Sequence, residues 1–205
     1  NIMFNHFQVK EFLLLLILGM DQNIHIQIMN KERNVEVDTL AKIELIKGRS
    51  YADMDALAKI LVDNYGNRVC DRDMSTLYED SVCPPNPIVD EVIEEMKVDF
   101  EAVTGEKIIN TQYWGHMHEK NMSTNTHNHR NSYVSAVLYA AVPEGSGKIV
   151  FRPRLNQYDN SAYASSYPPV KGVYYMFPGY LDHFVTRNNS DEMRVAISFN
   201  FSKKQ

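Results

Sequence analysis

The stretch Thr126 to Tyr139, THNHRNSYVSAVLY, decides the fold class of this chain. Its polar first half contains two histidines, and its second half is a run of β-branched and aromatic residues of the kind that favours strands. Similar runs, separated by turn residues, occupy most of the chain beyond residue 107. The strands predicted from these runs are Ile108–Trp114, Tyr133–Val142, Lys148–Phe151, Gly172–Phe177, Phe184–Thr186 and Met193–Phe201.

Towards the N-terminus, helical patterns replace most of these strands. Tyr51–Tyr65 has apolar residues at helical spacing, and Gly66 follows as a suitable C-cap. Pro87–Thr104 is the clearest helix, because Asn86 is a good N-cap and proline suits the first helical position. Helices followed by many short antiparallel strands predict a mainly β fold, a sheet sandwich with flanking helices. Two earlier short strands are predicted at Ile24–Met29 and Lys42–Ile46.

The length of 205 residues suits one domain with a full core. We expect residues 24–205 to form it, with strands and supporting helices in 24–106 and the β-rich core in 107–205. Residues 1–23 are an N-terminal segment of uncertain status. The apolar run Phe12–Leu18 is far shorter than the roughly 20 residues of a spanning helix, and a poor signal-peptide cleavage site follows it. A native start at Met20 and a buried N-terminal element are the two alternatives.

Charge and cysteine content narrow the class of protein. The formal net charge of −5 argues against a non-specific nucleic-acid binder, which would show a basic patch. Cys70 and Cys83 are the only cysteines, and their spacing matches neither a disulfide framework nor a zinc motif. We therefore expect a cytoplasmic protein with reduced thiols and no membrane attachment.

Two histidine pairs of the form H-x-H are candidates for chemistry. Side chains two apart on a strand point to the same face, so His127 and His129 can converge on one metal ion. Two surface histidines would explain the pair equally well. His116 and His118 form a second such pair, which we expect to be polar strand or loop residues, while Trp114 is expected in the core.

Further along the chain, His183 and Arg194 flank an Asn-Asn-Ser-Asp run that is typical of a turn. A hairpin centred near Asn189 would place Arg194 beside His183 on adjoining strands. A guanidinium beside a metal ligand suits a carboxylate cosubstrate, whereas pairing with Asp182 or Asp191 is the structural alternative. The strand that begins at Arg194 alternates a polar face with an apolar one. Gly145-Ser146-Gly147 predicts a second hairpin turn.

These pieces together resemble a known family, the 2-oxoglutarate/iron(II) oxygenases common in marine bacteria and their phages, which are distant relatives of prolyl 4-hydroxylases. The resemblance covers roughly residues 110 to 201 and favours the histidine pair 127/129 over 116/118. The matching stretches are His127–His129, Ser132–Tyr139, Pro143–Gly147, Phe177–Pro178, His183–Val185, Asn189–Arg194 and Ser198–Asn200.

The resemblance implies a double-stranded β-helix, or cupin-like jelly roll, with iron at its open end. By carry-over, His127 and His183 are metal ligands, and Arg194 binds the distal carboxylate of 2-oxoglutarate with help from Tyr139 and Ser135, which share one strand face. The wider superfamily has an aspartate where this chain has His129. Either His129 is the third ligand or it stands beside the metal with water in its place.

The implied activity is an Fe(II)/2-oxoglutarate-dependent dioxygenase that hydroxylates a substrate and converts 2-oxoglutarate to succinate. Molecular oxygen and a small-molecule or peptidyl substrate are the expected partners, without nucleic acid, and a homodimer is one option for the assembly. Two other classes of protein stay open. A three-histidine cupin-type enzyme would not use 2-oxoglutarate, and a non-catalytic jelly roll would hold no tight metal.

Overall fold

The computed structural model describes residues 43–65, 85–152 and 164–204. The chain divides into two units at residues 43 and 44, and the fold below belongs to the second, Glu44–Gln205. The predicted strand Ile24–Met29, the segment 1–23 and both cysteines lie outside the described residues. Among the helices that the structure describes, none is long and apolar enough to cross a membrane.

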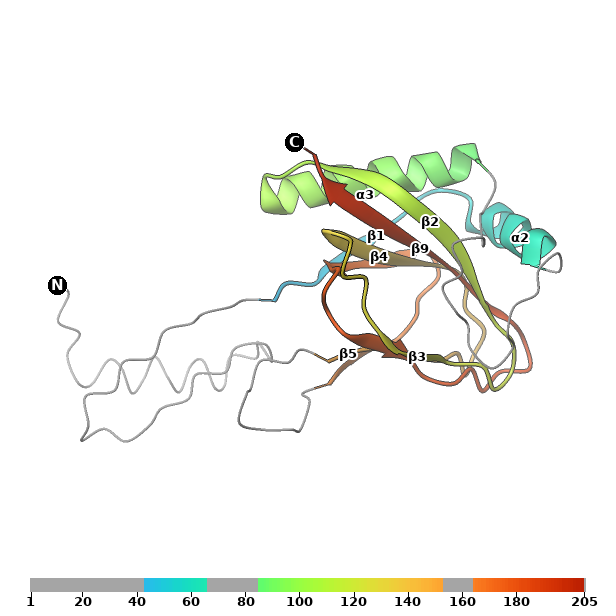
Figure 1. Ribbon diagram of the computed structural model, residues 1–205. Coiled ribbons are helices and arrows are strands. Elements are labelled where there is room, and N and C mark those ends of the chain that lie inside the picture. The colour runs from blue at the N-terminus through green and yellow to red at the C-terminus, as the bar shows by residue number, and fades with distance from the viewer. Residues whose placement is uncertain (1–42, 66–84, 153–163, 205) are drawn as a thin grey trace, which may run out of the picture. The chain divides into compact units, whose positions relative to one another are not determined.

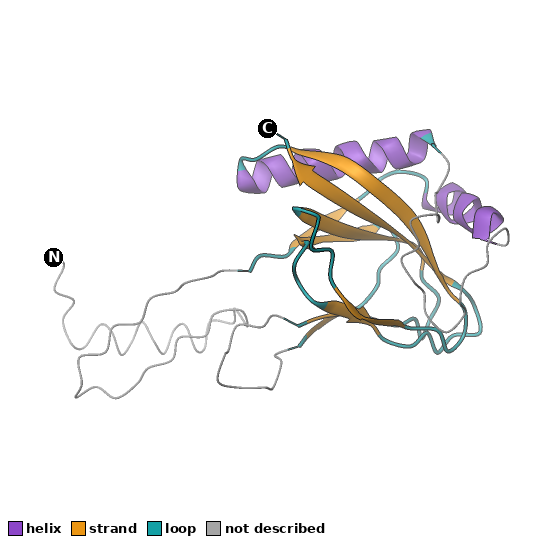
Figure 2. Ribbon diagram, viewed as in Figure 1, coloured by secondary structure: helices purple, strands orange, loops and turns teal. Residues whose placement is uncertain are grey.

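Two antiparallel sheets form two layers of the fold (Figures 1 and 2). One sheet has the strand order β1-β7-β4-β9-β2, and the other has the order β3-β8-β5-β6. The strands of the first are β1 (Ile46–Arg49), β7 (Val173–Pro178), β4 (Val134–Ala141), β9 (Arg194–Lys203) and β2 (Ile108–His118). Those of the second are β3 (Thr124–His127), β8 (His183–Val185), β5 (Ile149–Phe151) and β6 (Ser165–Tyr167).

The chain alternates between the two sheets as it runs from β2 to β9. Every connection along this path passes from one sheet to the other, except the one from β5 to β6, which pair directly. Eight strands wound in this way are a double-stranded β-helix, the jelly roll of cupins. The predicted fold class is therefore confirmed, with β1 as an additional edge strand of the larger sheet.

Two helices, α2 (Met54–Tyr65) and α3 (Pro87–Thr104), cover one face of the five-stranded sheet (Figure 2). The helix α3 has the predicted limits because both ends are capped. The side chain of Asn86 accepts a hydrogen bond from the backbone N–H of Ile88, and Gly105 closes the helix at a φ of 73°. The buried stripe Val89, Val92, Met96 and Phe100 faces the sheet.

Strand β9 shows how the sheet separates the core from the site. Val195, Ile197, Phe199 and Phe201 are buried in the hydrophobic core that includes the two helices. The alternate residues Arg194, Ala196, Ser198 and Asn200 point to the opposite face, towards the four-stranded sheet. The predicted alternation of a polar and an apolar face on this strand is thus confirmed.

Both predicted hairpins are wrong, because their strands lie in different sheets. β4 and β5 do not pair, nor do β8 and β9. Arg194 therefore lies opposite His118 of β2, and not beside His183 as predicted. Turn residues reverse the chain direction, but they do not specify the sheet in which the next strand pairs.

The segment around Gly147 makes a close approach instead of a hairpin. The backbone N–H of Thr186 donates to Lys148 O at 2.9 Å, and Lys148 N donates to the Thr186 hydroxyl at 2.8 Å. A Cβ atom at Gly147 would collide with the carbonyl group of Thr186. Glycine at this position lets the segment that leads into β5 pass directly against the residue after β8.

Candidate metal centre

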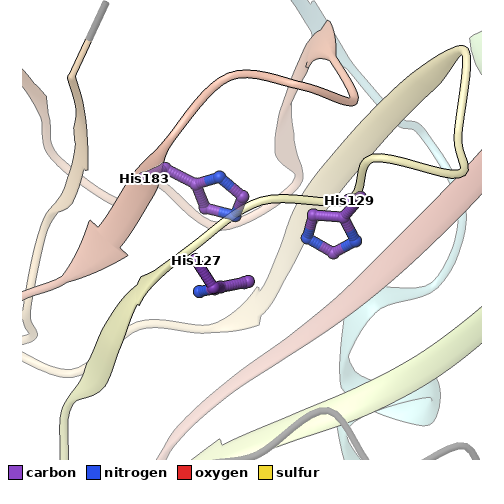
Figure 3. A group of neighbouring side chains, drawn as sticks. All are labelled: His127, His129 and His183. Carbon is purple, nitrogen blue, oxygen red and sulfur yellow. The ribbon is translucent and has the colours of Figure 1, made fainter.

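Three histidines from two chain segments meet at one end of the four-stranded sheet. His127 ends β3 and His183 begins β8, and the two residues face each other in the β-ladder. His129 lies two residues beyond the end of β3, on the chain that leads to β4 (Figure 3). The sequence placed His127 and His129 on one strand face, but His129 reaches the group from a loop.

The three imidazoles are close enough to share an ion. One nitrogen from each ring lies within 4.8 Å of the corresponding nitrogens of the other two. The ring centroids of His127 and His183 are 4.3 Å apart, and that of His129 lies 5.2 Å from each. Among the described residues, this is the one group of three or more histidine, cysteine or acidic side chains with such geometry.

Backbone carbonyls fix the tautomers of two of the rings. Nδ1 of His127 lies 2.8 Å from Asn125 O, and Nδ1 of His183 lies 2.9 Å from Leu181 O. A carbonyl oxygen can only accept, so each Nδ1 carries the hydrogen and donates it. Nε2 of each ring then keeps its lone pair, which is the arrangement that orients histidine as a metal ligand.

The environment keeps the three rings neutral. Burial lowers the pKa of His127, and it lowers the pKa of His183 well below its usual value, with a further contribution from His127. Burial and the neighbouring His127 also lower the pKa of His129 to about 4. A metal must displace any proton from its ligand nitrogen, so neutral imidazoles are ready to bind without that cost.

A loop contact holds His129 in place. Its backbone N–H donates to Gly179 O at 2.6 Å, and Ser132 N donates back to His129 O at 2.8 Å. Its ring stacks on Trp114, with 5.6 Å between ring centroids, and hydrogen-bonds the side chain of Asn200. The role of Asn200 beside the ring was not predicted, since only the alternation of β9 hinted that it faces this way.

No carboxylate from the described residues joins the three imidazoles. The nearest candidate by sequence, Asp182, accepts a hydrogen bond from Asn128 Nδ2 at 2.6 Å. The donor set is therefore three neutral nitrogens, a set that suits iron, zinc or copper.

Arg194 is buried on the inner face of the five-stranded sheet, and no acidic side chain in residues 43–65, 85–152 or 164–204 pairs with it. Only 2% of the residue is exposed, and its Nη1 donates to Gly147 O at 3.3 Å. The alternative that Arg194 pairs with Asp182 or Asp191 is not supported, because Asp182 accepts from Asn128 and Asp191 pairs with Lys120. Burial lowers the pKa of the Arg194 guanidinium, because its charged form is removed from water.

Tyr139 lies next to this guanidinium. The Arg194 Cζ atom is 5.8 Å from the centroid of the Tyr139 ring, and both residues are almost fully buried. Within the described part of the chain, neither the Tyr139 hydroxyl nor the Arg194 Nε has a hydrogen-bond partner. Unpaired buried polar atoms are rare and costly, so two of them at one cation fit a site for a bound carboxylate.

Ser135, the third predicted cosubstrate residue, is four positions from Tyr139 on the same face of β4. Its hydroxyl donates to Asn200 Oδ1 at 2.9 Å, and Asn200 in turn contacts His129. Four strand residues span roughly 13 Å, so Ser135 lies nearer the histidine end of the sheet than the arginine end.

Aromatic side chains close the space behind His183. Phe177 contacts the His183 ring with centroids 4.7 Å apart, and Phe151 packs against both rings. Tyr167 of β6 contacts Phe151 and Tyr175.

Residues 112–200 match a protein family described as "Putative 2OG-Fe(II) oxygenase". A search of curated proteins found no match. The matched region contains all six residues that the sequence selected for the site.

Solved structures share the fold at low sequence identity. A prolyl-4-hydroxylase from Pseudomonas putida is 14% identical over 78% of this chain and 88% of its own, with a TM-score of 0.53. AviO1 from Streptomyces viridochromogenes Tue57 is 15% identical over 77% and 89%, with a TM-score of 0.56. SnoK, a non-heme alpha-ketoglutarate-dependent carbocyclase from nogalamycin biosynthesis, is 12% identical over 77% and 78%, with a TM-score of 0.59. Two other matched chains are covered over only 56% and 59% of their length.

Proposed function

We propose that the chain is an oxygenase of the 2OG-Fe(II) type, in which His127, His129 and His183 hold the iron while Arg194 and Tyr139 hold 2-oxoglutarate; the family match over residues 112–200 supports this proposal. One observation supports this assignment most strongly. Three neutral imidazoles converge on one point, and a buried guanidinium that no described carboxylate pairs with faces the same interior from the opposite sheet.

The donor set fits iron(II) in charge state and geometry. His127 and His183 each offer Nε2, because their Nδ1 hydrogens are bound by backbone carbonyls. His129 contributes the third nitrogen and occupies the sequence position of the superfamily's aspartate. With three neutral ligands the centre is one charge more positive than a site with two histidines and one carboxylate, which alters its redox poise and metal preference.

When bound, iron(II) and 2-oxoglutarate supply the activation of oxygen, coupled to loss of carbon dioxide and formation of succinate. The side chains of this protein orient and shield that chemistry. Arg194 would donate N–H hydrogen bonds to the distal carboxylate, and the Tyr139 hydroxyl would donate a further one. Burial raises the pKa of Tyr139, so its hydroxyl keeps the proton that it donates.

Ser135 and Asn200 act at the other end of the pocket. The Ser135 hydroxyl holds Asn200, and Asn200 holds the ring of His129. We propose that Ser135 supports the cosubstrate by fixing this third ligand, not by contact with the distal carboxylate. Phe151 and Phe177 pack behind His183 and exclude water from that side.

The remaining partners are molecular oxygen and a substrate of the small-molecule or peptidyl class. A cytoplasmic location and a homodimer belong to the same proposal, and an origin in marine bacteria or phages stays a prediction from the sequence resemblance.

A spectroscopic titration tests the assignment. Purified protein is loaded with iron(II) without oxygen, and 2-oxoglutarate is added while the visible metal-to-ligand charge-transfer band is followed. The band should appear in the wild type and be absent in His183→Ala, which loses a ligand. In air, succinate should form in the presence of a substrate.

The two other classes of protein give different results. A three-histidine enzyme that does not use 2-oxoglutarate would bind iron but show no band and no succinate. A non-catalytic jelly roll would not bind iron tightly. Either result at saturating cosubstrate would contradict the proposed function.

A further inference from the structure

His118 is a buried histidine to which the proposed function assigns no role. It is fully buried at the end of β2, and it faces Arg194 directly across the ladder between β2 and β9. Residues that face each other in this way point to the same side of the sheet. The His118 ring therefore lies in the interior between the sheets, on the side of Arg194 and away from the helices.

Both the backbone and the ring of His118 are fixed. Asn188 Nδ2 donates to the His118 carbonyl oxygen at 2.8 Å. Ring Nε2 lies 3.0 Å from the hydroxyl oxygen of Thr124, which belongs to β3 in the opposite sheet. The ring thus connects the two layers through Nε2, while Nδ1 has no hydrogen-bond partner in the part of the chain that the structure describes.

The unpaired Nδ1 does not stand alone. Four buried side-chain polar atoms lack a partner among the described residues, and three of them are His118 Nδ1, Arg194 Nε and the Tyr139 hydroxyl. Arg194 faces His118, and Tyr139 faces Ala196, the next residue of β9 on the same side. Each unpaired buried group costs stability, so three neighbouring ones indicate that a polar ligand completes them.

The charge of His118 decides what it can contribute. Burial and the nearby Arg194 lower the pKa of His118 to about 3. The ring is therefore neutral, and Arg194 supplies the only positive charge of this group of three residues. A neutral ring can still donate one hydrogen bond if the other nitrogen accepts.

We propose that His118 is a further 2-oxoglutarate-binding residue: its Nδ1–H donates to the distal carboxylate that Arg194 and Tyr139 bind, and the Thr124 hydroxyl holds this tautomer by donating to Nε2. This inference rests on the proposed function, because it needs 2-oxoglutarate as the ligand. It also gives the second H-x-H pair of the sequence a role at the opposite end of the cosubstrate from the metal.

Two ligands separate the carboxylate contact from metal chelation. 2-Oxoglutarate and 2-oxobutyrate share the keto acid that chelates iron, but 2-oxobutyrate lacks the distal carboxylate. Both are titrated against iron-loaded protein without oxygen, in the wild type, His118→Leu and His118→Asn. Asparagine places an amide N–H near the position of Nδ1, so it restores the donor that leucine removes.

His118→Leu should weaken 2-oxoglutarate binding about 10-fold to 100-fold, the range for a hydrogen bond to a charged group. Binding of 2-oxobutyrate and of iron should stay unchanged, and His118→Asn should recover most of the loss. Thr124→Val should produce a smaller loss for 2-oxoglutarate alone, because it only releases the tautomer.

Equal losses for both ligands would assign His118 a structural role and overturn the inference, as would a leucine variant with wild-type affinity or an asparagine variant no better than leucine. In those cases the wild type still binds 2-oxoglutarate and the proposed function stands. A wild type that binds iron but not 2-oxoglutarate would instead contradict the proposed function, and this inference with it.

Discussion

Replacement of Arg194 by methionine should have opposite effects on cosubstrate binding and on the stability of the ligand-free protein. Methionine has a similar length but neither charge nor N–H donors. Loss of one partner from a buried, hydrogen-bonded charge pair costs about 2–5 kcal/mol, so the Kd for 2-oxoglutarate should rise roughly 30-fold to several thousand-fold. Iron affinity should hardly change, because Arg194 is not among the three convergent side chains.

The stability effect follows from the missing counter-ion. Arg194 is 2% exposed, and no carboxylate among the described residues forms an ion pair with it. Replacing buried ionic groups by apolar side chains often stabilises a protein by about 1–4 kcal/mol. Loss of the hydrogen bond to Gly147 O offsets about 1 kcal/mol of this. We therefore expect ligand-free Arg194→Met to be as stable as the wild type or up to about 3 kcal/mol more stable.

Thermal unfolding with and without ligand measures both effects at once. For a unit of this size, each kcal/mol shifts the Tm by about 2–4 °C. Added at about 100 times the wild-type Kd, 2-oxoglutarate should stabilise the iron-loaded wild type by about 2.7 kcal/mol and the variant by at most about 0.9 kcal/mol. The matched control is Arg152→Met, since Arg152 is exposed and lies over the Phe184 ring.

Two results would refute the reasoning about Arg194. A ligand-free variant that is clearly less stable than the wild type would mean that the guanidinium already has its partners. Wild-type affinity for 2-oxoglutarate in the variant would remove Arg194 from the cosubstrate site.

Three further predictions concern the loop, the carboxylate and the buried histidine. Gly179→Ala should lower iron affinity at least about 10-fold, because its Cβ would lie 2.7 Å from His129 O. The control Gly105→Ala has no atom near the new Cβ and should only lower stability. Equal iron affinity in both variants would contradict this prediction. Asp182→Asn should leave iron affinity within about threefold in a competition with a chelator, and a tenfold loss would make Asp182 a ligand. The pKa of His118 is lowered to about 3 in the folded chain, so between pH 6.5 and about 3 the unfolded chain binds a proton at this residue and the folded chain does not. The free energy of unfolding should therefore fall by up to about 1.4 kcal/mol for each pH unit as the pH falls through this range. Denaturant unfolding should show a shallower pH dependence in His118→Asn, and parallel curves would contradict the assignment.

Local signals predicted the secondary structure where the determining interactions are local. The helix Pro87–Thr104 has the predicted limits because its caps involve residues next to its ends. The strand predicted to end at Trp114 continues to His118, since its pairing with β9 does not stop at Gly115. Strand β3 was not predicted, because Thr124–His127 is polar and its partner β8 is distant in the sequence.

Sheet assignment is the part that the sequence could not provide. His183 and Arg194 are 11 residues apart around a clear turn, but their strands enter opposite sheets. Which sheet a strand joins depends on burial against distant strands, and turn residues do not encode that choice. The sequence therefore did not predict that His118 lies opposite Arg194 in the β-ladder, although both residues belong to motifs that it contains.

The sequence selected the three histidines that the structure brings together, while their role as metal ligands stays a prediction. The order of short motifs selected these residues, His127, His129 and His183. The alternation along β9 predicted that Arg194 points into a polar interior. What no local pattern could indicate is that Arg194 Nε and the Tyr139 hydroxyl have no hydrogen-bond partner among the described residues, because that depends on every other chain segment nearby.

The two halves of the site belong to different layers of the sandwich. The proposed metal ligands come from β3, the segment after it and β8, whereas Arg194, Tyr139 and His118, the proposed cosubstrate residues, come from the larger sheet. A molecule anchored at both ends is thus a removable cross-link between the layers. Because each of the two groups of residues belongs to its own sheet, we expect substitutions in one sheet to change the affinity for one end of a bound cosubstrate and to leave the contacts with the other end unchanged.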